Sequence, residues 1–426
     1  MTTLVRTLTF RDVTLFIIGS VIGSGIFLTP GPVMHDVDGK IGPAILVWLA
    51  GGVLSLLGAL TYGEMSAMKP DSGGLYVYIR DCFGKFAAFM FGWTLFFVVA
   101  AGSNATLAVA FGKYMAEIVP LSNFGQKVAA IAMIAVITAV NVSGTRHSAN
   151  LTNLATGLKV GGILLMSAVL LYLGHGFGQT KGAVWPAHLD SSVATGFGTG
   201  MIAVLWAYEG WQYCTYTAGE TKDPQRNFPR SLLIGTLSLI AIYLIANFAY
   251  LAALGPEGVS RSISIAAISV KAIIGQKAAT FVALVILISI LSAANTTCLG
   301  APRVFYAMAA DGLFLKRFAA VHERYKTPAA AIVVGSVWAA FLAAMGSFVQ
   351  LLTFVIFIGW IFYGLAAASI FVYRRRNPDT ARPYRVPGYP ITPLVFILSA
   401  AALVVKTLWT QPVSDSIKGL GVVAIG

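Results

Sequence analysis

A stretch rich in glycine and serine, residues 18–27 with the sequence IGSVIGSGIF, interrupts the first long apolar segment of the chain. Each glycine inside a helix costs about 1 kcal/mol relative to alanine. A bilayer has no water to replace lost backbone hydrogen bonds, so an interrupted membrane helix persists where its freed groups line a cavity or contact a ligand. The stretch is therefore predicted to form part of a binding site.

A second interruption falls in the sixth apolar segment, where residues 206–212 read WAYEGWQ. This run places the carboxylate of Glu209, a glycine and the amide of Gln212 in mid-membrane. Broken helices at corresponding positions of two halves are the best sequence indicator of a transporter's substrate site. The two breaks are predicted to face each other near the membrane midplane.

The two breaks together suit an α-amino acid. Free N–H groups at the start of a half-helix attract a carboxylate, and free carbonyls at the end of the preceding half-helix attract an ammonium group. The amides of Gly23, Ser24 and Gly25 are predicted to hold the carboxylate, and the carbonyls of Val21 and Trp206 to hold the amino group. The alternative is that the small residues Gly19, Ser20 and Gly23 only allow close helix packing.

Two ionisable residues lie inside predicted spans and are functional candidates by default. Glu209 either contacts substrate or makes a structural hydrogen bond to a neighbouring half-helix. Lys159 lies about a turn and a half inside the fifth segment. It either extends to the membrane interface or provides a fixed cation beside the first break, which replaces a coupling ion and can release a proton if desolvated.

The composition indicates a polytopic all-α membrane protein that forms a single transmembrane domain over residues 1–426. The chain is 57% hydrophobic and 11% charged, with a mean hydropathy of +0.80, whereas about 25% of residues are charged in soluble domains. Apolar runs predict eleven spans, at about residues 11–30, 41–66, 85–112, 127–143, 153–173, 196–219, 231–254, 279–308, 328–346, 348–373 and 391–410. A twelfth begins near Lys418 but is too short to cross the bilayer, so we expect it to be incomplete.

Basic residues are distributed unevenly over the alternating loops. With a cytoplasmic N-terminus, about 18 lysines and arginines face inward and about 9 outward, as the positive-inside rule requires. The chain is therefore expected to be a multi-pass protein of the plasma (inner) membrane with its N-terminus inside.

The two broken spans each begin a set of five spans. Because five is odd, the second set starts from the opposite side of the membrane. This predicts two inverted repeats over about residues 11–173 and 196–373, followed by C-terminal helices over about 391–426.

Several other functions find no support in the sequence. The net charge of +13 is spread over short loops and does not indicate nucleic-acid binding, and the three cysteines imply no disulfide framework. No HExxH, GxSxG or Walker A pattern occurs, and the five histidines do not converge in sequence. We therefore expect no enzyme activity, no metal and no cofactor, and the expected partners are membrane lipid and a small-molecule substrate.

Ordered motifs along the chain resemble those of the amino acid–polyamine–organocation superfamily, most closely its L-type amino acid transporter branch and bacterial relatives. These motifs are IGSGIFLTP (22–30), KPDSGGLYVY (69–78), WAYEGW (206–211), GETKDPQRNFPR (219–230), MAADG (308–312) and RPYRVP (382–387). The resemblance runs from about Phe10 to the end of the chain. It implies a leucine-transporter-like fold of two inverted five-helix repeats plus one or two C-terminal helices, with spans 1 and 6 broken.

The resemblance also implies roles for individual residues. Trp206 becomes an aromatic gate, and Lys159 the ion substitute of sodium-independent relatives. A side-chain pocket would be formed by Asn104, Asn295, Phe357 and Trp360, for which interhelical packing or hydrogen bonding is the alternative. Glu209 stands where many relatives carry glycine or aspartate, which leaves the charge preference open. The loop over residues 113–126 has no cysteine, so no disulfide-linked heavy subunit is expected.

The function these features favour is sodium-independent transport of neutral L-amino acids across the plasma membrane by alternating access, most simply as obligatory exchange. Proton-coupled symport through Lys159 or Glu209 is the alternative within transport. A sensor that binds an amino acid without moving it is a different class of protein, and such a sensor would usually carry a signalling domain, for which the short termini and loops leave no room.

Overall fold

The computed structural model describes the chain apart from residues 1–3, 180–183, 187–190, 346–347 and 411–426, and it describes no side chain for residues 179, 279, 348–357 and 407–410. The described residues form helices and no β-strand, with one isolated parallel bridge between Leu8 and Thr221. The all-α prediction is therefore confirmed. The predicted twelfth span, from Lys418, lies outside the described residues.

The helices follow the predicted spans closely. In chain order they are α1 (Phe10–Val21), α2 (Gly25–Leu28), α3 (Pro30–Asp36), α4 (Ile41–Met68), α5 (Leu75–Phe83), α6 (Lys85–Thr94), the π-helical η1 (Leu95–Val99), α7 (Ala100–Ile118), α8 (Asn123–Val142), α9 (Thr145–Leu173), η2 (Gly176–Gln179), α10 (Ser191–Ala207), the 3-10 helical η3 (Trp211–Glu220), α11 (Pro224–Ser260), α12 (Ile265–Ile273), α13 (Gln276–Ala310), η4 (Lys316–Ala319), α14 (Ala329–Met345), α15 (Phe348–Arg376) and α16 (Ile391–Thr410). Seven of the continuous helical stretches in the described part are long and apolar enough to cross a membrane.

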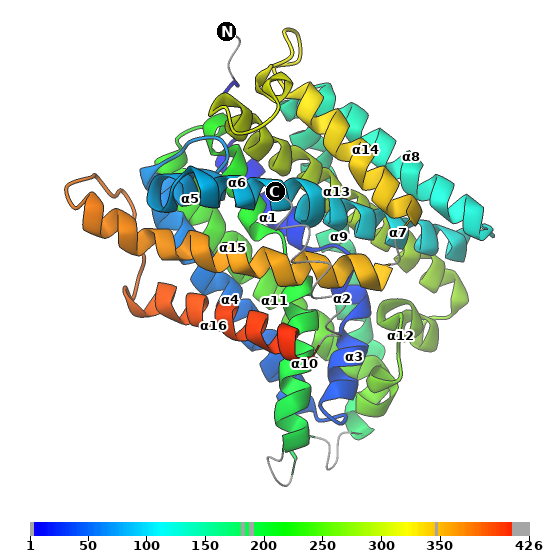
Figure 1. Ribbon diagram of the computed structural model, residues 1–426. Helices are drawn as coiled ribbons and strands as arrows, with labels where there is room; N and C mark the ends of the chain where they lie inside the picture. The colour runs from blue at the N-terminus through cyan, green and yellow to red at the C-terminus, as the bar shows by residue number, and fades with distance from the viewer. Residues whose placement is uncertain (1–3, 180–183, 187–190, 346–347, 411–426) are drawn as a thin grey trace.

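Both predicted interruptions are present. The first span stops at Val21 and resumes at Gly25, and the sixth is divided into α10 and η3 by a turn at Gly210. Gly210 has φ +122°, a conformation that favours glycine because it has no Cβ. Figure 1 shows α1, α2 and α3 following one another through the middle of the molecule, with α10 beside α3.

Close packing explains why α2 begins with glycine. A Cβ on Gly25 would lie 2.7 Å from the Cα of Ala207, at the end of α10, so a larger residue would push the two broken spans apart. Gly25 thus has a packing role that the sequence did not predict for it, and this role does not exclude a ligand, because the same contact brings the two breaks together.

The surrounding helices hold this central pair in place. Helix α4 packs on α11, α13 packs on α7, and α1 contacts α9, α11 and α13. Helices α15 and α16 lie side by side across the near face in Figure 1. The elements that were not predicted are the short helices α3, α5, α12, η2 and η4 between the spans, and the π-helical turn η1 inside the third span. The division into two inverted repeats stays a prediction.

Candidate functional site

The break in the first span leaves backbone groups exposed to a ligand. The N–H of Gly23 donates to the carbonyl of Val21 over 2.8 Å and is thus already used. The N–H groups of Ser24 and Gly25 have no backbone acceptor in the described part of the chain, and the buried hydroxyl of Ser24 has no partner there. Of the three amides predicted to hold a carboxylate, these two are the ones available for it.

The carbonyls at the end of α1 are shared among several donors. The carbonyl of Val21 accepts from the N–H of Gly23 and from the hydroxyl of Tyr243, at 3.1 Å, which fills its two lone pairs. The carbonyl of Trp206 accepts only from the N–H of Glu209, at 3.0 Å, among the described residues. Trp206 therefore keeps acceptor capacity for an amino group, and Val21 does not.

Lys159 reaches the same break from α9. Its side chain is fully buried, and Nζ donates to the carbonyls of Gly19, at 2.7 Å, and Ile22, at 2.6 Å. Ser289 on α13 donates to the carbonyls of Ile22 and Gly23, at 2.9 and 3.0 Å. The lysine thus points into the break, away from the membrane surface. Its ammonium group donates hydrogen bonds to two carbonyls that no longer have helical partners.

Glu209 is held by two donors. Its Oε1 accepts from Nε2 of Gln212, at 2.6 Å, and from the hydroxyl of Tyr363 on α15, at 2.5 Å. The residue also lines the cavity between the two breaks. Both roles raised by the sequence, structural hydrogen bonding and access to a ligand, are therefore compatible with its position.

A cavity of about 30 Å³ separates the breaks. It is lined by six of the predicted residues, Val21, Gly23, Ser24, Gly25, Trp206 and Glu209. A buried water molecule needs about 10–15 Å³ of such space, so the cavity has room for about two waters and an amino acid fits only after the surrounding helices move. The geometry therefore represents a closed form of the site.

Comparison with known proteins supports the family resemblance that the sequence motifs suggested. Residues 8–423 match the family model described as amino acid permease. The chain is 31% identical over 407 residues to the serine/threonine exchanger SteT of Bacillus subtilis, covering 93% of this chain and 90% of that protein. It is 29% identical to the mouse b(0,+)-type amino acid transporter 1, covering 93% and 81%, and 29% identical to the rabbit large neutral amino acids transporter small subunit 2, covering 96% and 77%.

The chain belongs to the amino acid permease family. The resemblance drawn from the sequence motifs is thereby confirmed, as is a multi-pass membrane architecture. The permease's family and relatives are transporters, in keeping with the expected absence of enzyme activity.

Three of the four predicted side-chain pocket residues, Asn104, Asn295 and Trp360, do not line the permease's central cavity among the described residues. Asn104 lines a neighbouring cavity of about 20 Å³, which shares Thr297 with the central one. Trp360 is buried against Phe396, with ring centroids 5.6 Å apart. The side chain of Phe357 lies outside the described residues.

Asn295 is the clearest departure among these four. Its amide is used in hydrogen bonds between helices: Oδ1 accepts from Asn141, at 2.8 Å, and Nδ2 donates to the hydroxyls of Ser148 and Thr152, at 3.0 and 2.9 Å. These bonds tie α13 to α8 and α9, so the structure favours the alternative of interhelical hydrogen bonding for this residue.

Sequence reasoning missed part of the cavity wall. The additional lining residues are Ser20, Ser103, Leu107, Gly210, Tyr213, Ala293 and Thr297. Ser103 is next to the predicted Asn104, and Tyr213 lies three residues beyond the second glycine break, but neither type of residue is distinctive in a membrane helix. Helical spacing from Asn104 would have pointed to Leu107.

The end of the permease that carries the N-terminus is closed by polar contacts. Asp12 accepts from Arg146, at 2.7 Å, and from Asn153, at 2.6 Å, both on α9. Glu220, at the end of η3, pairs with the fully buried Arg303 on α13, at 2.6 Å. Both broken spans are therefore fastened to their neighbours on this side, and an opening here must break these contacts.

Proposed function

We propose that the permease exchanges neutral L-amino acids across the plasma (inner) membrane, without sodium, by alternating access around the cavity between its two breaks. In this proposal the N-terminus is cytoplasmic, as the distribution of basic residues over the loops favours. The closed end of the cavity would then be the cytoplasmic gate.

The position of Lys159 carries the proposal. Its ammonium group contacts two freed carbonyls of the broken first span, a set of ligands that suits a bound cation. A covalently attached cation does not leave with the substrate, so transport needs no sodium gradient through this place. The loss of substrate then leaves unpaired dipoles in both breaks, which disfavours the closed empty carrier and favours exchange.

The substrate would bind through its backbone groups. Its carboxylate would accept from the N–H groups of Ser24 and Gly25, and its amino group would donate to the carbonyl of Trp206. The relative named as a serine/threonine exchanger supports a small neutral side chain. The loop over residues 113–126 has no cysteine, so we propose that the permease works without a disulfide-linked subunit.

Uptake of radiolabelled serine into proteoliposomes tests the proposal. We expect strong stimulation by unlabelled serine inside the vesicles, and no effect of an inward proton gradient or of sodium. Uptake into empty vesicles that depends on a proton gradient would instead make the permease a proton symporter, with Lys159 and Glu209 as the proton carriers to test. Binding without uptake would indicate a sensor.

A further inference from the structure

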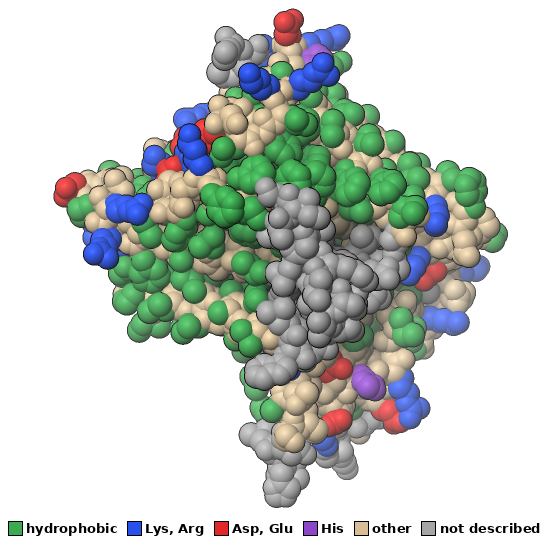
Figure 2. Space-filling model, in the orientation of Figure 1, with side chains coloured by type: hydrophobic (Ala, Val, Ile, Leu, Met, Phe, Trp, Pro, Cys, Tyr) green, Lys and Arg blue, Asp and Glu red, His purple; other side chains and the backbone are tan. Residues whose placement is uncertain are grey.

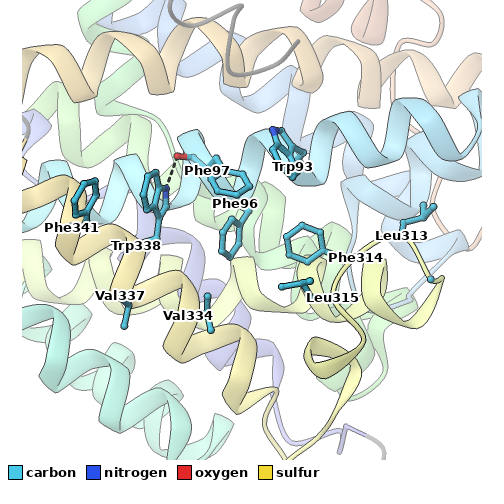
Figure 3. Close-up of a pocket in the computed structure, with 11 residues that line it drawn as sticks. Trp93, Phe96, Phe97, Leu313, Phe314, Leu315, Val334, Val337, Trp338 and Phe341 are labelled. Atoms are coloured by element: carbon cyan, nitrogen blue, oxygen red, sulfur yellow. Dashed lines mark hydrogen bonds between the residues drawn. The ribbon is translucent and has the colours of Figure 1, made fainter. Parts of the chain in front are cut away.

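An apolar groove of about 830 Å³ lies on the outer surface between the third span, the α13–α14 connection and α14 (Figure 3). Six aromatic side chains line it, namely Trp93, Phe96, Phe97, Phe314, Trp338 and Phe341. It is far larger than the central cavity and shares no lining residue with it. The apolar lining of this groove suits an apolar ligand and does not suit an amino acid.

The aromatic wall is fixed by its own contacts. The indole of Trp338 donates to the carbonyl of Phe97 over 2.9 Å, which satisfies a backbone group in the π-helical turn η1. Trp338 also stacks on Phe341, with centroids 5.3 Å apart, and meets the edge of Phe97 at 5.8 Å. The indole N–H of Trp338 is used within the wall, so the surface that it shares with Phe97 and Phe341 is apolar and preformed.

Basic charge lies at one end of this groove. Leu315 lines the groove, and Lys316 and Arg317 follow it directly with exposed side chains. Neither cation has an ion-pair partner in the described ranges, whereas the nearby Asp311 is already paired with Arg80 at 2.7 Å. Figure 2 shows hydrophobic side chains over this face, with a group of lysine and arginine side chains above them. An anionic headgroup would find uncompensated positive charge here.

We propose that the groove binds an acyl chain of an anionic phospholipid, whose phosphate is held by Lys316 and Arg317. The phosphate group accepts from both side chains, and the acyl chain covers the aromatic wall. A second copy of the permease fits less well, because a two-fold interface through this groove would bring the same basic residues of both copies together.

The groove is also linked to the transport cavity through shared lining residues. The effect on transport that we infer from this link rests on the proposed function. Phe96 lines both the groove and the cavity of about 20 Å³ beside Asn104, and Thr297 lines both that cavity and the central one. An acyl chain that contacts Phe96 is therefore connected to the central cavity through packed side chains. Anionic lipid is expected to raise the exchange rate.

Retention of phosphatidylglycerol tests the headgroup contact without requiring transport. Protein extracted from vesicles of phosphatidylcholine and phosphatidylglycerol is analysed by native mass spectrometry. Lys316→Gln with Arg317→Gln should lower the bound phosphatidylglycerol about fivefold for each charge removed, which corresponds to about 1 kcal/mol per basic residue. The control is Lys222→Gln with Arg226→Gln, which removes the same charge from another exposed segment and should change nothing. Equal loss in both pairs would overturn the proposal.

Filling the groove tests the acyl-chain contact. Val334 lines the groove and its neighbour Val333 does not, yet both are on α14 and both are 43% exposed. Val334→Trp should reduce bound phosphatidylglycerol severalfold and remove its stimulation of serine exchange, while Val333→Trp should leave both unchanged. Retention of lipid in Val334→Trp, equal binding of phosphatidylcholine, or cross-linking of two copies through the groove would overturn the proposal. Normal lipid binding without any exchange would contradict only the proposed function.

Discussion

The ammonium nitrogen of Lys159 lies 2.6 Å from the carbonyl oxygen of Ile22, the residue at which the first span stops being helical. The lysine comes from α9, and the carbonyl can accept from it because the helix ends here and no backbone N–H among the described residues donates to this oxygen. A break in one span is thus joined to a charge in another. This contact ties the shape of the candidate site to the position of α9.

Removing this charge should impair exchange. Lys159→Gln leaves the carbonyls of Gly19 and Ile22 without a charged donor, and a hydrogen bond to a charged group contributes about 1.5 to 3 kcal/mol. We expect serine exchange in proteoliposomes to fall by at least about tenfold. Lys271→Gln removes an exposed lysine of α12 and is the control. Unchanged exchange by Lys159→Gln at every pH would remove the lysine from the mechanism.

The contact between Gly25 and Ala207 predicts a strong effect of a single methyl group. In Gly25→Ala the new Cβ would lie 2.7 Å from a backbone atom, so α2 and α10 must separate. Substrate should no longer raise the melting temperature, because the amide of residue 25 moves out of reach. Gly157→Ala is the matched control: its Cβ would meet nothing within 4 Å, and alanine is the better helix former. A normal serine-induced shift in Gly25→Ala would contradict the proposed site.

The sequence was sufficient to predict the spans and both breaks, because apolar length and glycine content depend on local chemistry. It also identified Lys159, since a charge inside an apolar run is conspicuous. The choice between an interfacial and a buried lysine required the structure, because the carbonyls of Gly19 and Ile22 come from another helix. Periodicity does not reveal which helix faces which break.

The pocket residues show the same limit. Asn104 and Asn295 are both amides in spans, but only the structure distinguishes one beside a cavity from one whose amide is used by Asn141 and Thr152. The π-helical turn at residues 95–99 was not predictable either, because its sequence, LFFVV, is ordinary for a membrane helix. Such features depend on tertiary contacts.

Substitutions of Glu209 can distinguish a structural hydrogen-bonding role from contact with the substrate. Glu209→Gln keeps an oxygen that can accept from Tyr363 and Gln212, so stability and serine exchange should stay within about twofold of the wild type. Glu209→Ala leaves a buried hydroxyl without its acceptor, which costs about 1 to 3 kcal/mol, and should lower the melting temperature. Thermal melting and exchange are measured on both variants. Loss of exchange in a stable Glu209→Gln would assign the charge itself to the transport cycle.

The ion pair between Arg303 and Glu220 should contribute to stability far more than an exposed pair of the same length. Both partners are buried, at 0% and 1% exposure, and removal of one leaves an uncompensated charge, which costs about 3 to 5 kcal/mol. The pair of Arg261 and Glu257 has the same 2.6 Å separation but is 79% and 73% exposed, and such pairs contribute about 0 to 1 kcal/mol. Arg303→Leu should therefore lower the melting temperature strongly and Arg261→Leu hardly at all, as measured by thermal denaturation in detergent. Equal shifts would mean that water reaches the pair at the closed end, and the gate proposed there would have to be placed elsewhere.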